Sequence, residues 1–212
     1  MKRIWTIYAL AVAVVAIAVC APASASASPV WRIEGKTISE SQNVLKESKV
    51  SSAFELSTEI LGIKILVKCP GWSYDSPTLL LETIVTFGHF LFGPGCRLYD
   101  DGTLTSCKFP EEKIATTEID GELQGSEAEP KLTLKPKTGT TLAEIPVSSC
   151  VFEGTYTLTG TIAAELTEAT KEQKSHNLTF TNASELKLGS ATAKVAGSGS
   201  LELESGKNWS AS

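Results

Sequence analysis

The sequence predicts an all-β protein, an antiparallel β-sandwich or jelly roll with little or no helix once an N-terminal signal is removed. Apolar and polar residues alternate with period two through most of the chain, which is the pattern of half-buried strands. Threonine fills many of the polar positions, and its β-branched side chain suits a solvated pleated surface. Turn signals such as Asp101-Gly102 and Lys137-Thr138-Gly139 separate many short runs, as in sandwiches and barrels.

The first 27 residues have the three parts of a secretory signal peptide. Lys2 and Arg3 form a positive start, residues 4–19 are uncharged and apolar, and small residues end the segment. The apolar run is shorter than the roughly 20 residues of a membrane-spanning helix. We expect cleavage after Ala27, leaving residues 28–212 as a single β-rich domain that is secreted or held at the cell envelope. Cys20 keeps a lipid anchor open as an alternative, because small residues also precede the cysteine of bacterial lipoproteins.

The expected elements follow the chain after this signal. Residues 39–49 are the best helix candidate, with Ser39 as a cap and a thin apolar stripe. The clearest strand is Thr155–Thr167, in which apolar residues share one face and threonines dominate the other. Residues 87–95, rich in Phe and Gly, are read as a core strand that enters a loop. Further alternating stretches are 63–69, 131–135, 178–181, 186–188, 193–195 and 201–203. The last two read as a hairpin with its turn at Gly197-Ser198-Gly199, and residues 127–130 are the candidate for a soft break.

Four cysteines remain after the expected cleavage: Cys69, Cys96, Cys107 and Cys150. An even number in an exported chain predicts two disulfides. A two-residue turn at Asp101-Gly102 places Cys96 opposite Cys107, so this pair is favoured. That position is a hydrogen-bonded one, where Cβ atoms stand farther apart than a disulfide prefers, so pairing of each with Cys69 and Cys150 stays open.

The composition argues against several function classes. Removal of Lys2 and Arg3 with the signal takes the formal net charge from −5 to −7, and Arg32 and Arg97 are then the remaining arginines. An acidic, arginine-poor surface disfavours nucleic acid and anionic membranes as partners. The cysteines lack Cys-x-x-Cys spacing and the two histidines, His89 and His176, are isolated, so we expect neither a metal site nor a cofactor.

One short motif carries candidate chemistry. In Thr117-Glu118-Ile119-Asp120-Gly121-Glu122-Leu123, the order Glu, apolar, Asp, x, Glu resembles the acidic strand of the retaining β-glucanases with a lectin-like jelly roll. The resemblance implies Glu118 as nucleophile and Glu122 as acid/base, since retention uses two carboxylates about 5 Å apart. The motif departs from the family at Gly121, where an apolar residue is usual. Asp120-Gly121 is also a turn signal, which would reverse the chain between the two glutamates.

A second resemblance extends over most of the chain. Residues 31–35 (Trp-Arg-Ile-Glu-Gly), the cysteine-ended stretch 62–69, and residues 150–160 with their Cys-x-x-x-Gly-x-Tyr segment resemble a group of uncharacterised exported proteins of high-GC Gram-positive bacteria. This resemblance implies export and a β fold, and it implies no activity.

Two function classes follow. The favoured one is a non-catalytic extracellular or cell-envelope module, structural or ligand-binding, because catalytic groups are not clustered in the sequence. Its partner class is a cell-surface or glycan ligand. The alternative is a secreted glycoside hydrolase that uses the segment Glu118-Ile119-Asp120-Gly121-Glu122.

Overall fold

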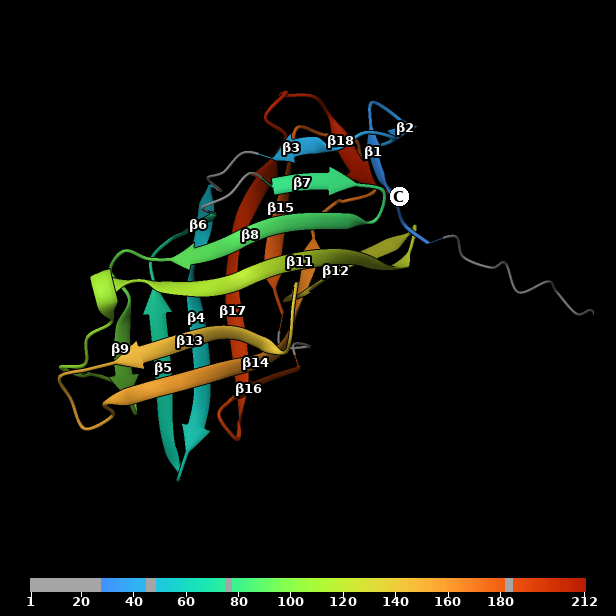
Figure 1. The fold of residues 1–212 in the computed structure, drawn as a ribbon. Helices are drawn as coiled ribbons and strands as arrows, with labels where there is room; N and C mark the ends of the chain where they lie inside the picture. The colour runs from blue at the N-terminus through green and yellow to red at the C-terminus, as the bar shows by residue number, and fades with distance from the viewer. Residues whose placement is uncertain (1–27, 45–48, 75–77, 182–184) are drawn as a thin grey trace, which may run out of the picture.

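The computed structural model describes residues 28–44, 49–74, 78–181 and 185–212, and it is an all-β sandwich (Figure 1). The fold class predicted from the alternation is therefore confirmed. The expected signal peptide, 1–27, and Cys20 within it lie outside the described residues. Within the described ranges there is no helix with the length and apolar character that crossing a membrane requires.

The chain forms eighteen described strands and one short 3₁₀ helix, η1 (Pro110–Glu112). The strands are β1 (Trp31–Ile33), β2 (Lys36–Thr37), β3 (Gln42–Val44), β4 (Val50–Ile60), β5 (Ile63–Cys69), β6 (Trp72–Tyr74), β7 (Thr78–Leu81), β8 (Ile84–Phe92), β9 (Arg97–Asp100), β10 (Thr103–Leu104), β11 (Ile114–Ser126), β12 (Glu129–Pro136), β13 (Thr141–Val147), β14 (Gly154–Leu166), β15 (Ser175–Phe180), β16 (Glu185–Leu188), β17 (Ala191–Glu202) and β18 (Trp209–Ala211).

The large sheet is antiparallel and folds over on itself. Its main path runs β10-β9-β5-β4-β17-β15-β14-β12-β11-β8-β7-β3, with β13, β16 and β6 added at its sides. In Figure 1, β8, β11, β13 and β14 form the near layer and cross over β5, β4 and β17 in the far layer. A separate three-stranded sheet, β18-β1-β2, lies at one end. Of the expected soft break at residues 127–130, residues 127 and 128 form the tight turn between β11 and β12, and residues 129 and 130 already belong to β12, where Glu129 pairs with Ser126.

Strand β14 shows why the period-two pattern was informative. Leu158, Ile162, Ala164 and Leu166 are buried, while the threonines between them face outward, as predicted. Gly160 marks the point at which the neighbours of this strand change. Residues before it pair with β13, and residues after it pair with β12.

The core between the layers contains an aromatic cluster. The rings of Phe54 and Phe92 stack with centroids 3.8 Å apart, and Phe180 meets Phe54 edge-on at 6.0 Å. Phe90 and Phe92 both come from the Phe- and Gly-rich stretch 87–95, and both are buried in β8. The interpretation of this stretch as a core strand is confirmed.

Two local predictions were wrong. Residues 39–49 contain strand β3, whose Gln42 pairs with Leu80 of β7, so cross-strand pairing prevails over the weak helical stripe; residues 45–48 lie outside the described chain. The expected hairpin at Gly197-Ser198-Gly199 is instead the middle of one continuous strand, β17. Glycine serves there to let Trp72 approach, since a Cβ on Gly199 would lie 2.5 Å from the indole ring.

Candidate functional site

The four cysteines form Cys69–Cys96 and Cys107–Cys150, so the favoured Cys96–Cys107 pair was wrong and the alternative pairing is the one formed. The Asp101-Gly102 turn does pair Asp100 with Thr103, as expected. However, β9 also pairs with β5, where Lys68 lies opposite Arg97, and this brings Cys69 against Cys96. The chain after β10 then turns away.

Cys107 reaches its partner through a separate contact. Lys108 and Ser148 exchange backbone hydrogen bonds of 2.9 and 3.0 Å, and this bridge holds the loop after β10 beside the loop after β13. Cys107 and Cys150 flank the bridge, with Cα atoms 4.9 Å apart. Both disulfides therefore join segments that only the folded sheet brings together.

The predicted turn at Asp120-Gly121 was also wrong, because β11 runs unbroken through both residues. Ile119 and Leu123 are buried, and Gly121 lies between them on the same inner face. A Cβ on Gly121 would stand 2.6 Å from a methyl of Val85 and 3.0 Å from Leu132. Glycine occurs at position 121 because the core has no room there for a side chain, and the chain does not turn at this residue.

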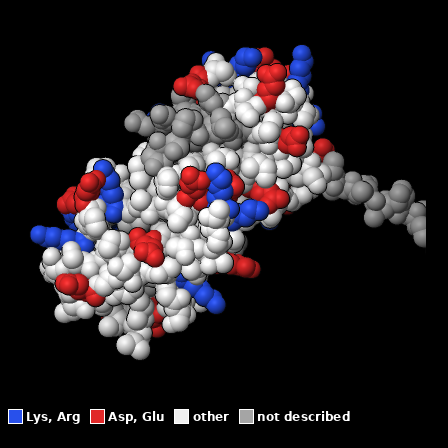
Figure 2. All heavy atoms as spheres, viewed as in Figure 1, with Lys and Arg blue, Asp and Glu red and all other residues white. Residues whose placement is uncertain are grey.

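The carboxylates of this segment consequently share the outer face of one strand. Glu118 forms an ion pair with Lys137, and Glu122 forms one with Lys135, each at 2.8 Å. Asp120 lies between them, opposite Lys135 in the β11–β12 ladder. Figure 2 shows acidic and basic side chains interspersed over the viewed side of the molecule, without a region of one sign. The two glutamates are engaged with lysines of the connection to β13 and of β12 rather than with each other.

These pairs change the proton affinity of one lysine. The hydrogen bond from Lys137 to Glu118, together with the negative charge of the same carboxylate, raises the pKa of Lys137 above its usual 10.5. The ammonium form is thus favoured over the whole neutral range. The pair is an exposed one, and its ordinary role is to align neighbouring segments on a solvated face.

The two histidines lie on different strands. His89, on β8, pairs in register with Glu118 of β11 and is partly exposed. His176, on β15, is 1% exposed, and its ring meets the Trp209 indole edge-on at 4.4 Å. His176 therefore occupies a buried structural position.

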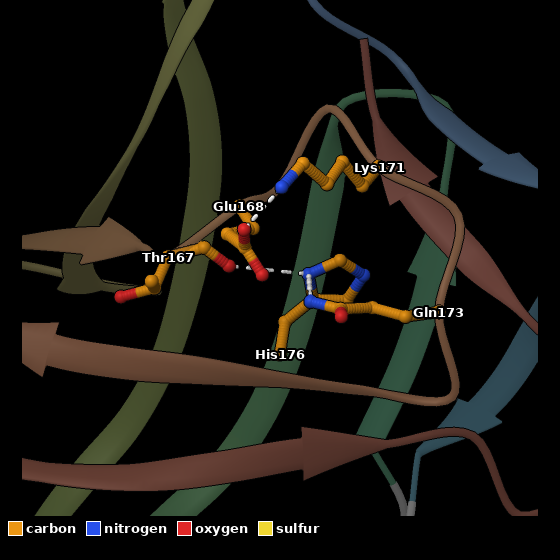
Figure 3. Close-up of polar contacts among 5 residues, drawn as sticks. All are labelled: Thr167, Glu168, Lys171, Gln173 and His176. Atoms are coloured by element: carbon orange, nitrogen blue, oxygen red, sulfur yellow. Dashed lines mark hydrogen bonds and ion pairs between the residues drawn. The ribbon is translucent and has the colours of Figure 1, made fainter.

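Both ring nitrogens of His176 have hydrogen-bond partners. Nε2 lies 2.7 Å from the carbonyl oxygen of Trp209, which can only accept, so Nε2 carries the proton. Nδ1 lies 3.1 Å from the side-chain amide nitrogen of Gln173 and 3.4 Å from the carbonyl oxygen of Thr167. Figure 3 shows this ring beside Glu168, whose carboxylate also contacts the ammonium of Lys171. The arrangement anchors β18, and with it the three-stranded sheet, to the large sheet.

A groove on the outer face of the far layer was not foreseen from the sequence. One part, of about 630 Å³, crosses β17, β4 and β5 and is lined by Ser57, Glu59, Lys64, Thr192 and Lys194, with Asp101 at its end. These are the ends of β4 and β5 that extend beyond β14 in Figure 1. The lining combines charged and hydroxyl side chains with aliphatic carbon, to which Ile65 and Leu66 contribute.

A second groove of about 650 Å³ continues the first. It is lined by Thr140, Thr159, Glu185, Lys187 and Thr192, so Thr192 belongs to both. The register accounts for this continuity, because Thr159 lies opposite Lys187 and Lys187 lies opposite Thr192. Together the two grooves form a path across β14, β16, β17, β4 and β5, which we call the transverse groove.

Several charged side chains in the transverse groove are available to a ligand, whereas the Asp101 carboxylate accepts a hydrogen bond of 3.1 Å from the backbone N–H of Lys64. On the same face of β4 and β5, Glu55 and Lys68 lie opposite each other and form an ion pair at 2.7 Å. Glu59 and Lys64 have the same cross-strand relationship, yet they form no ion pair among the described residues. Lys187 and Lys194 also lack an acidic partner in the part of the chain that the structure describes.

Sequence reasoning missed this groove although it identified its components. The alternation correctly placed Lys64, Lys187 and Thr159 on outward faces. Their proximity depends on the order of strands from distant parts of the chain, which no local pattern contains. Among the described residues, no group of three or more His, Cys, Asp and Glu side chains is placed to hold a metal ion.

Comparison of the chain with protein-family models, with curated proteins and with solved structures found no match.

Proposed function

We propose that this protein is an exported, non-catalytic module that binds an extended polar ligand outside the cell or at its envelope. The N-terminal segment 1–27 supports export, and two disulfides suit an oxidising compartment. The resemblance of residues 31–35, 62–69 and 150–160 to exported Gram-positive proteins supports the same location.

The transverse groove is the observation that carries the proposal. It is open, it spans five strands, and most of its charged and hydroxyl groups come from strand positions, with Asp101 and Thr140 added from turns. Such a surface suits a chain-like ligand that lies across the sheet, because functional groups recur at each strand, about 4.8 Å apart. The rigid scaffold spares the protein most of the cost of ordering its own side chains and loops on binding.

Cosedimentation of the purified mature protein with isolated Gram-positive cell walls tests this proposal. We expect the protein to be retained, and Thr192→Tyr to abolish retention, because the exposed Thr192 joins both parts of the groove. Thr133→Tyr, the same substitution on the outward face of β12, is the matched control and should be retained like the wild type. Absence of retention, or equal loss in both variants, would contradict the proposal.

The alternative function, a glycoside hydrolase, has one observation in its favour. Glu118, Asp120 and Glu122 lie on the outward face of one continuous strand, as the resemblance to the β-glucanases requires. Against it, the carboxylates of Glu118 and Glu122 are each held at 2.8 Å by a separate lysine, Lys137 and Lys135. The two carboxyls of a retaining enzyme instead converge on one sugar and stand about 5 Å apart.

Turnover of β-glucans by the wild type and by Glu118→Gln separates the two functions. We expect no turnover by either protein, and cell-wall retention by Glu118→Gln and Glu122→Gln equal to that of the wild type. Hydrolysis by the wild type that disappears in Glu118→Gln would assign the protein to the enzyme class.

A further inference from the structure

We infer that the ligand of the transverse groove is a neutral, hydroxyl-rich polymer, a polysaccharide without charged substituents. This inference rests on the proposed function and specifies the chemistry of its ligand. It follows from the charge balance of the groove, from the availability of its donors and acceptors, and from the absence of one type of side chain in its lining.

The charges of the groove cancel. Lys64, Lys187 and Lys194 contribute three positive charges. Glu59, Asp101 and Glu185 contribute three negative ones. A site for a phosphate- or carboxylate-bearing polymer would have an excess of basic groups, because such ligands are attracted by net field and by release of counterions. A balanced groove gains nothing from a ligand of one sign.

A ligand with hydroxyl groups suits this balance of charges better than a charged ligand. A sugar hydroxyl both donates and accepts, so it can accept from a lysine ammonium and donate to a glutamate carboxylate. The side chains of Glu59 and Lys64 keep these capacities because they do not form the ion pair that Glu55 and Lys68 form on the same two strands. Thr159 and Thr192 add hydroxyls that can take either role.

Aromatic side chains are absent from the described lining of both parts of the groove. Stacking of a ring on a sugar face therefore contributes nothing, and recognition relies on hydrogen bonds and on contact with aliphatic carbon such as that of Leu66. Two consequences can be measured. Binding to a single short segment is weak, so long polymers are retained far better than short oligosaccharides. Retention also changes little with salt, since screening weakens attraction between opposite charges and leaves neutral contacts intact.

The experiment uses insoluble β-glucan, α-glucan and mannan, with polygalacturonate immobilised on a resin as the anionic polymer. Cosedimentation is measured at about 50 mM and about 500 mM NaCl, below and above physiological screening. We expect at least one neutral polysaccharide to retain the wild type equally at both salt concentrations. Glu59→Gln combined with Lys187→Met should weaken retention roughly fivefold, as the loss of one or two hydrogen bonds implies.

The control variant removes one acidic and one basic side chain from a face outside the groove. Glu122→Gln combined with Lys135→Met removes an ion pair from β11 and β12 and should leave retention unchanged. Retention by polygalacturonate alone, lost at high salt, would overturn the inference. Retention by cell walls but by no neutral polysaccharide would also overturn it while leaving the proposed function standing. Failure on cell walls as well would overturn both.

Discussion

Trp72 packs so closely against Gly199 that a Cβ built on this glycine would lie 2.5 Å from Cζ2 of the indole. The glycine belongs to the middle of β17, and the tryptophan belongs to β6, more than a hundred residues earlier in the chain. The contact places the indole beside Phe180, with ring centroids 5.7 Å apart, so it forms part of the aromatic core.

Gly199→Ala should therefore lower the free energy of unfolding by about 1–3 kcal/mol, because the added methyl forces the buried indole to shift. Chemical denaturation of the two proteins measures the difference. Ala196→Ser, at an exposed position of the same strand, should change stability by less than about 0.5 kcal/mol. Equal stability of Gly199→Ala and the wild type would show that Trp72 does not occupy this position.

Leu61 offers the opposite case, a substitution that should stabilise. It forms the β4–β5 turn with Gly62, it has a φ of 53°, and its side chain is 98% exposed. A leucine there bears the cost of a left-handed backbone and buries nothing in return. Leu61→Asn should raise the free energy of unfolding by about 0.5–1 kcal/mol, since Asn tolerates this conformation and is typical of such turns.

Val151→Asn is the control for Leu61→Asn. Val151 is 92% exposed but does not have a positive φ. Val151→Asn therefore makes the surface equally more polar without removing any backbone strain. Denaturation midpoints should rise for Leu61→Asn alone. A rise in both variants would attribute the effect to surface polarity instead.

Loss of the Cys107–Cys150 disulfide should destabilise the protein strongly. The bond closes a loop of 43 residues, for which the chain-entropy model gives about 4 kcal/mol. The double variant Cys107→Ser, Cys150→Ser should show this loss in urea denaturation, and Cys69→Ser, Cys96→Ser a slightly smaller one for its separation of 27 residues. Peptide mapping without reductant must first find these two bonds and no free thiols among the four.

The anchor at His176 predicts a local effect. His176→Ala removes a buried ring and the 2.7 Å hydrogen bond to Trp209, and should cost about 2–4 kcal/mol. Hydrogen exchange at the amides of Trp209 and Ala211 should accelerate more than exchange in β14. His176→Phe keeps the volume but not the hydrogen bonds, so it should lie between Ala and wild type. Unchanged exchange in β18 would rule out the anchoring role.

Acid stability should depend on Glu168. The hydrogen bond and positive charge of Lys171 lower the pKa of Glu168 below its usual 4.5. The folded pKa is lower than the unfolded one, so this carboxylate stabilises the fold above about pH 4.5 and the contribution is lost as pH falls through the folded pKa. Glu168→Gln and Lys171→Met should each flatten the stability curve there. A curve as steep as that of the wild type in both would contradict the shift.

Alternation predicted the strands well because burial of one face is a local property of the sequence. Leu132 and Leu134, for example, are buried in β12 as expected, with lysines and a threonine outward. Glycine was the source of error. Asp120-Gly121 and Gly197-Ser198-Gly199 carry the signals of turns, yet both lie in continuous strands. The side chains that exclude a Cβ there come from Val85 and Trp72, which no nearby residue reveals.

The disulfides and the transverse groove escaped prediction for a related reason. Each depends on which strands become neighbours. The sequence favours pairing of Cys96 with Cys107, the nearer cysteine in the chain. In the fold, β5 pairs with β9 and places Cys69 next to Cys96. Lys64 and Lys194 meet the same groove from strands more than a hundred residues apart. The local sequence pattern predicts which face of a strand is buried, but the order of strands in the sheet decides which residues meet in a disulfide or a groove.

The side chains of the transverse groove have one further property, which concerns how such a protein can diverge. Glu59, Lys64, Lys187, Thr192 and Lys194 are all exposed, and none of them contributes to the buried core. Substitutions of these residues therefore leave the packing of the core intact while they change the charges and hydrogen-bonding groups that line the groove. If the groove binds a polymer as we propose, related chains can keep the same sandwich and disulfides yet differ in the polymer they bind, because the residues that would set ligand preference are not the residues that stabilise the fold.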